Sequence, residues 1–111
     1  MSKDLDISVV IAFHNHAKMT IDCVKSLYEY GPSVREVILI SNNSSADELL
    51  RVKNYASTTT NTKVLVWDYP FNYQKEYNWG IQQSKGKFVL MLNNDIELRP
   101  NSRGLIERMY K

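Results

Sequence analysis

Residues 86–100, GKFVLMLNNDIELRP, decide the fold of this chain. The apolar run at residues 88–92 carries no charge, and such a run predicts a strand buried on both faces of a parallel sheet. The run leads directly into Asn93, Asn94 and Asp95. Ligands of open parallel sheets bind just beyond the carboxyl ends of the strands, and oxygen ligands suit magnesium, calcium or manganese rather than zinc or copper. We therefore expect Asp95 to hold a divalent cation that in turn binds a phosphorylated substrate.

Length, charge and cysteine content limit the class of protein. A chain of 111 residues has room for one domain with one core. Its net charge of +2, with Lys and Arg scattered along the chain, argues against a nucleic-acid partner. No apolar run is long enough to span a bilayer, and the start MSKDLD is unlike a signal peptide. The single Cys23 excludes an internal disulfide and fits a reducing compartment. We expect a cytoplasmic protein, peripheral to the membrane in its full-length form.

Strand and helix patterns alternate along the chain. Apolar runs rich in β-branched residues predict further strands over residues 7–13, 34–40 and 63–67. Apolar residues at helical spacing predict helices over residues 17–30, 46–56 and 73–85, with a last short helix after Ser102. In the first helix, the face expected to lie on the sheet carries Met19, Cys23, Leu27 and Tyr30.

Local signals predict where these helices begin and end. Asn15 is expected to cap the start of the first helix, and Gly31 to end it in a left-handed conformation. Ser45 and Glu48 have the spacing of a capping box for the second helix. Asn72 is expected to cap the third.

This alternation predicts an α/β fold with a doubly wound, mostly parallel sheet. The expected strand order is 3-2-1-4, which places a crevice where the winding reverses between the first and fourth strands. Residues 13–15 and 93–95 are the polar strand ends beside that crevice. Two such ends at one switch point predict a ligand site there.

Three segments of the chain, in their order and spacing, resemble a known family. They are SVVIAFHN at residues 8–15, ISNNSSADE at residues 40–48, and YPFNYQKEYNWGIQQSKGKFVLMLNNDIE at residues 69–97. Together they resemble the N-terminal half of a family-2 glycosyltransferase of the Rossmann-like glycosyltransferase-A fold, of the type that builds bacterial surface polysaccharides. The resemblance implies that residues 1–111 form a single nucleotide-sugar-binding domain. It also implies transfer of a sugar from a nucleotide-diphosphate sugar to a saccharide or lipid-linked acceptor, with Mg²⁺ or Mn²⁺.

The resemblance assigns the base and ribose contacts to the first two strand ends. Those expected against the base and ribose are Ala12, Phe13, His14 and Asn15. Ser41 and Asn42 would meet the base edge. The family usually has Asp at the position of Ser41, and a serine accepts a hydrogen bond without the charge that strengthens it.

The resemblance assigns the diphosphate and metal contacts to two later segments. Those expected to touch the base or the diphosphate are Asn72, Lys75 and Asn78. Asn93, Asn94 and Asp95 replace the Asp-x-Asp motif of the family, with Asn93 on the ribose and Asp95 on the metal. Because alternate residues of a strand face the same way, Glu97 is expected to support the same cation.

The family's general base is a carboxylate in the C-terminal half, so no catalytic base is assigned. We expect a chain truncated before the acceptor-binding half, which binds donor but does not transfer sugar unaided. The alternative is a non-catalytic nucleotide-binding or assembly module that forms a homo-oligomer through the surface left by truncation. A nucleotidyltransferase, dinucleotide or P-loop site would need glycines after the first strand, and AFHNHAKM has none. His14 and His16 lack a third zinc ligand, and Cys23 fits a small buried core residue.

Overall fold

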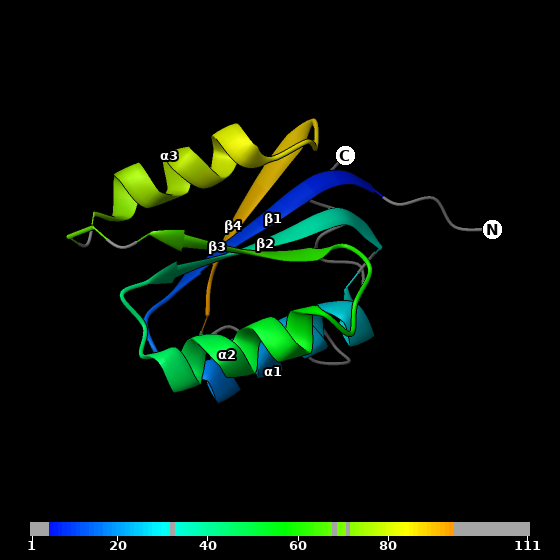
Figure 1. Cartoon of the computed structure of the whole chain (residues 1–111). Helices are drawn as coiled ribbons and strands as arrows, with labels where there is room; N and C mark the ends of the chain where they lie inside the picture. The colour runs from blue at the N-terminus through cyan, green and yellow to red at the C-terminus, as the bar shows by residue number, and fades with distance from the viewer. Residues whose placement is uncertain (1–4, 32, 68, 71, 95–111) are drawn as a thin grey trace.

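The computed structural model describes residues 5–31, 33–67, 69–70 and 72–94 (Figure 1). Its elements, in chain order, are β1 (Leu5–Phe13), α1 (Ala17–Tyr30), β2 (Val34–Asn42), α2 (Ala46–Ala56), β3 (Thr62–Trp67), α3 (Tyr73–Gln83) and β4 (Phe88–Asn93). The predicted helix after Ser102 lies outside the described residues, as do Asp95 and Glu97. None of the described helices is both long and apolar enough to cross a membrane.

The four strands form one parallel sheet in the order β3-β2-β1-β4, which confirms the predicted topology. Val9 of β1 lies opposite Val37 of β2 on one side and Leu90 of β4 on the other. Helices α1 and α2 cover one face of the sheet and α3 covers the other (Figure 1). The winding therefore reverses between β1 and β4.

Strand alternation divides the core into two apolar layers. On the α1 and α2 side, the β1 residues Val9 and Ile11 pack with the helix residues Val24 and Leu27. On the α3 side the cluster consists of Val10, Ile38, Ile40 and Tyr77. Each β1 residue thus contributes to one layer or the other, because successive side chains point to opposite faces.

Strand β4 is not buried on both faces, so that prediction is wrong. Phe88 is 49% exposed and Met91 is 47% exposed. Helix α3 packs chiefly on β1 and β2, and within the described residues β4 pairs only with β1. An apolar run shows that a strand is covered somewhere, but the helix that covers it is set by tertiary packing.

The predicted caps of α1 are also wrong. His16, not Asn15, occupies the N-cap, with φ 52° and no side-chain cap bond. Asn15 is itself left-handed (φ 53°), and its Oδ1 accepts a hydrogen bond from Ser45 N at 2.7 Å. Its side chain therefore joins the β1–α1 turn to the β2–α2 turn and is not available to the helix. Gly31 is extended (φ −97°, ψ 176°), and its N–H donates to the Leu27 carbonyl at 2.8 Å.

The N-cap of α3 agrees with prediction, whereas only half of the capping box predicted for α2 is formed, because Ser45 N donates to Asn15 Oδ1 and not to Glu48. Ser45 Oγ accepts from Glu48 N at 3.3 Å, and Asn72 Oδ1 accepts from Lys75 N at 2.9 Å. Both signals depend on residues within one helical turn, which is why the sequence reveals them.

The prediction of which α1 side chains face the sheet is partly correct. Cys23 is 1% exposed and Leu27 is fully buried, whereas Met19 is 42% exposed. The buried positions of α1 are Ala17, Thr20, Cys23, Val24, Ser26 and Leu27.

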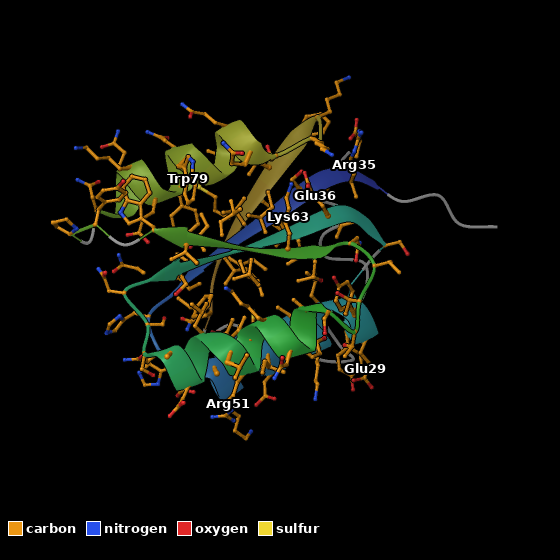
Figure 2. The ribbon with its side chains drawn as sticks, in the orientation of Figure 1. Glu29, Arg35, Glu36, Arg51, Lys63 and Trp79 are labelled. Carbon is orange, nitrogen blue, oxygen red and sulfur yellow. The ribbon has the colours of Figure 1, made fainter. Side chains whose placement is uncertain are left out.

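A buried carboxylate fixes the start of β4 at the amino-terminal edge of the sheet. Glu36 accepts hydrogen bonds from Ser8 Oγ at 2.6 Å and from Lys85 N, and it forms an ion pair with Lys63 at 3.1 Å (Figure 2). Ser8 Oγ in turn accepts from Gly86 N at 2.8 Å. Burial alone would raise the pKa of Glu36, but these hydrogen bonds outweigh it and lower the pKa. This network joins β1, β2 and the turn before β4.

Candidate functional site

A pocket of about 430 Å³ opens at the carboxyl ends of β1 and β4. We call it the strand-end pocket. Its lining residues are Ala12, Phe13, His14, His16, Met19, Asn42, Glu76, Tyr77, Asn93 and Asn94. They come from β1, β2, α3, β4 and the beginning of α1. The pocket therefore lies at the switch point of the sheet, where ligands bind in folds of this kind.

The structure brings six of the thirteen predicted site residues together in this pocket. They are Ala12, Phe13, His14, Asn42, Asn93 and Asn94. Parallel pairing sets Ala12 directly opposite Asn93. The two polar strand ends thus meet, as their places in the sequence predict.

The histidine that follows β1 has a defined tautomer. His14 Nδ1 lies 2.6 Å from the carbonyl oxygen of Asn42. Since a carbonyl can only accept, Nδ1 carries the proton and donates it. The exposed ring then presents Nε2, which lies 3.4 Å from Asn15 Nδ2.

The side chain of Asn42 supports the pocket rather than projecting freely into it. It is 5% exposed, and its Nδ2 donates to the carbonyls of Trp67 and Tyr69, each at 3.2 Å. These bonds hold the segment between β3 and α3 against the end of β2.

Tyr77 of α3 ties β1 to β4 beneath the pocket. Its hydroxyl accepts from Ala12 N at 3.2 Å and donates to the Leu92 carbonyl at 3.0 Å. On the far side, Asn94 Nδ2 donates to Thr20 Oγ1 at 3.3 Å. The strand ends that carry the predicted ligand contacts are therefore fixed by α3 and α1.

The other predicted site residues lie elsewhere. Ser41 is 1% exposed, and its Oγ has no hydrogen-bond partner within the described residues. Its neighbour Ile40 faces α3, so alternation turns Ser41 toward α1 and α2, away from Asn42. Asn15 holds the two turns together, as described above, and Asn78 is exposed on α3. The predicted metal ligands Asp95 and Glu97 lie outside the described residues; Asp95 is next in sequence after Asn94.

Asn72 and Lys75 line a second pocket of about 420 Å³, which we call the aromatic pocket. Its other lining residues are Trp67, Tyr69 and Pro70. The Trp67 and Tyr69 rings meet edge to face, with centroids 5.2 Å apart, and Tyr69 is 63% exposed. The aromatic pocket offers flat apolar surface beside one cation.

Glu76 is a functional candidate that the sequence reasoning missed. It is 0% exposed and lines the strand-end pocket. Its Oε2 accepts from Asn72 N at 3.3 Å, whereas Oε1 has no partner among the described residues. Burial raises the pKa of this carboxyl, and the Asn72 bond offsets part of that effect. One signal was available in the sequence: Glu76 stands three residues after Tyr73 and four before Gly80, a spacing that places the three on one face of a helix.

The described part of the chain contains no group of three His, Cys, Asp or Glu side chains placed to hold a metal. The strand-end pocket does offer amide oxygens of Asn93 and Asn94, next in sequence to Asp95. Oxygen donors of this kind fit a hard cation such as Mg²⁺ or Mn²⁺.

Comparison with known proteins gives three findings. A family model for glycosyl transferase family 2 matches residues 8–111. The O-antigen biosynthesis protein RfbC of Myxococcus xanthus is 33% identical over 93 residues, which are 83% of this chain and 7% of that protein. The mannosyltransferase PcManGT from Pyrobaculum calidifontis, solved with GDP-Man and Mn²⁺, superposes with a TM-score of 0.78 over 95% of this chain and 31% of that one. At 17% identity the last likeness shows the fold alone. The chain spans less than a third of either relative.

Proposed function

The chain belongs to glycosyl transferase family 2, and from this premise we propose that it binds the nucleotide-diphosphate sugar donor of a glycosyl transfer reaction in the strand-end pocket. The full-length protein then transfers the sugar to a saccharide or lipid-linked acceptor. The similarity to an O-antigen biosynthesis protein supports a role in bacterial surface polysaccharide synthesis. We propose that the protein acts on the cytoplasmic side of the membrane.

One observation carries this proposal: the parallel sheet joins the ends of β1 and β4 in a single pocket at its switch point. Its volume lies in the range of small-molecule sites, which is about 300–1,000 Å³. The pocket combines apolar wall from Phe13 and Met19 with amide groups from Asn93 and Asn94. That mixture suits a ligand with a flat base at one end and hydroxyl and phosphate oxygens at the other.

Each side chain has a role in this proposal. Backbone and side chains of residues 12–15 lie against base and ribose, and Asn93 hydrogen-bonds a ribose hydroxyl. Lys75 of the adjacent aromatic pocket offers a cation to the base or the diphosphate. Asp95, with Glu97, holds Mg²⁺ or Mn²⁺, which when bound neutralises the charge that develops on the leaving diphosphate.

A second candidate function is that of a non-catalytic assembly module. The exposed Phe88 and Met91 on β4 favour it, because apolar side chains on an edge strand promote association between chains. The average molar mass of an assembly module in solution would rise with protein concentration, and its melting temperature would not change when nucleotides are added.

Thermal unfolding with nucleotides and metals tests the proposal. UDP, dTDP and GDP are each added with and without Mg²⁺ or Mn²⁺, because a ligand that binds the folded state must raise the melting temperature. At 100 times the dissociation constant the gain is about 2.7 kcal/mol, or a rise of about 10 °C for a domain of this size. We expect a nucleotide-specific rise that depends on metal.

The matched variants are Asp95→Asn and, at the exposed start of α2, Asp47→Asn. Asp95→Asn is expected to remove the metal-dependent part of the rise, and Asp47→Asn to retain it. If no nucleotide gives a metal-dependent rise in the wild-type protein, donor binding is wrong. If the metal effect survives Asp95→Asn, the metal ligand is misassigned.

A further inference from the structure

Glu76, which lines the strand-end pocket, has one carboxylate oxygen whose hydrogen-bonding capacity is unused. Glu76 is 0% exposed, and only Oε2 is paired, with Asn72 N at 3.3 Å. Oε1 is buried without a partner among the described residues. A buried acceptor left unsatisfied costs about 1–3 kcal/mol, and more when it is charged. Such groups are rare in folded proteins, and each needs an explanation.

The position at the start of α3 explains only half of this carboxylate. A negative charge in the first turn of a helix is favourable, and the bond from Asn72 N to Oε2 satisfies one amide there. That role uses a single oxygen. It gives no reason for the second oxygen to be buried at the wall of a pocket.

Several donors in the described part of the pocket are engaged with acceptors other than Glu76. His14 Nδ1 donates to Asn42, and Asn42 Nδ2 donates to the carbonyls of Trp67 and Tyr69. The hydroxyl of Tyr77 donates to Leu92, and Asn94 Nδ2 donates to Thr20. None of the described donors is paired with Oε1, and we expect its partner to come from the bound ligand.

We propose that Glu76 determines base specificity by accepting the ring N–H of the donor's nucleobase at Oε1. This inference rests on the proposed donor binding. It selects bases with a ring N–H next to a carbonyl, namely uracil, thymine or guanine, over cytosine and adenine.

The charges of the ligand indicate that its base, and not its diphosphate, lies beside Glu76. The diphosphate is negatively charged and would be repelled by Glu76, so it is expected beside the cation that Asp95 is proposed to hold, and the base is expected nearer to Glu76. Glu76 lies on the α3 side, beside Tyr77 and close in sequence to Asn72 of the aromatic pocket. Ser41, which the sequence places at the base edge, is buried and turned away from Asn42. Among the described lining residues Glu76 is the one carboxylate, so it is the strongest hydrogen-bond acceptor offered to the base.

The test compares each base with its N-methylated form by isothermal titration calorimetry, in the presence of Mn²⁺. The probe is whichever of UDP, dTDP and GDP binds best, and its partner is N3-methyl-UDP, N3-methyl-dTDP or N1-methyl-GDP. Hydrogen bonds to charged groups are worth about 1.5–3 kcal/mol, so methylation is expected to weaken wild-type binding about 10- to 100-fold. CDP and ADP should bind as weakly as the methylated base.

The variant is Glu76→Gln, with Glu29→Gln as the control. Glu29 lies on α1, across the sheet from α3 (Figure 2). In Glu76→Gln the amide oxygen can keep the bond from Asn72 N, which leaves the amide NH₂ facing the pocket. Parent nucleotide binding should then fall about 10-fold or more, and methylation should have no further effect. Glu29→Gln should keep the full methylation effect.

The outcomes separate the two proposals. If Glu76→Gln weakens parent and methylated nucleotides by the same factor, Glu76 has only a structural role and the inference is overturned. Loss of binding on removal of the ribose 2′-hydroxyl, with no effect of base methylation, would assign Oε1 to the ribose and also overturn it. Should Glu76→Gln fail to fold, equal wild-type affinity for the parent and methylated base would still refute the inference. If the wild-type protein binds no nucleotide diphosphate at all, donor binding itself is wrong.

Discussion

Replacing Gly86 with alanine should destabilise the protein more than the same change at Gly80. A Cβ at Gly86 would lie 2.6 Å from Ser8 N, 2.7 Å from Ser8 Oγ and 2.9 Å from the Ile7 carbonyl carbon. Two of these atoms are backbone of β1, which is hydrogen-bonded on both sides and cannot move aside. A Cβ at Gly80 would also be close, at 2.8 Å from Ile40 Cδ1 and Val10 Cγ1, but these are side-chain atoms.

Two contributions set the loss in free energy of unfolding that we expect for Gly86→Ala. Overpacking a tight contact costs about 1–3 kcal/mol. Displacing the turn also strains the bonds from Gly86 N to Ser8 Oγ and from Ser8 Oγ to Glu36, each worth about 1 kcal/mol. We expect Gly86→Ala to cost about 3 kcal/mol, a fall of roughly 10 °C in melting temperature. At Gly80 the gain of about 1 kcal/mol in helix propensity offsets part of the overpacking, which leaves a net loss of about 1 kcal/mol.

Urea unfolding followed by circular dichroism measures both variants. The reasoning is refuted if Gly86→Ala lies within about 1 kcal/mol of wild type, or if Gly80→Ala is the more damaging change. Because Gly86 anchors the beginning of β4 and Asn93 ends it, Gly86→Ala should also weaken nucleotide binding in the folded protein.

Two further changes test the charge of Glu36 at the amino-terminal edge of the sheet and the cap of α3. Since the pKa of Glu36 is lowered in the folded state, its ionised form contributes stability above the unfolded value near 4.5, and this contribution is lost as the pH falls below it. The free energy of unfolding of wild type should therefore exceed that of Glu36→Gln at pH 6, and the gap should narrow by pH 3; a gap that is constant with pH would contradict this. Asn72→Ala should cost about 1 kcal/mol by removing the cap on Lys75 N, measured without nucleotide. Gln74→Ala, exposed in the same helix, should cost nothing, and an equal loss in both variants would show that the cap is unimportant.

The sequence predicts the features of this fold that depend on alternation and on local spacing. Strand order, parallel pairing and the meeting of His14 with Asn93 follow from a β-α repeat with polar residues after the strands. The caps at Ser45 and Asn72 follow from residues within one turn of each other.

The features that the sequence did not predict depend on contacts between distant residues. Asn15 looks like a helix cap, but Ser45, thirty residues later, takes its side-chain oxygen. The apolar run that forms β4 predicts a strand buried on both faces, but α3 packs chiefly on β1 and β2 and leaves β4 partly exposed. Glu76 looks like a solvated helix charge until α3 lies against the sheet and buries it. In each case the residue type is compatible with two environments, and tertiary packing selects one.

The parallel connectivity also sets the order in which this domain can form as it leaves the ribosome. Ser8 is hydrogen-bonded to Glu36, which lies 28 residues later in the sequence, and to Gly86, which lies 78 residues later. During synthesis, β1 can therefore acquire its β2 neighbour early, while its other edge stays open until β4 has been made. An unpaired strand edge can pair with other nascent chains. We therefore expect β1 to need protection from such pairing until β4 has been made and pairs with it.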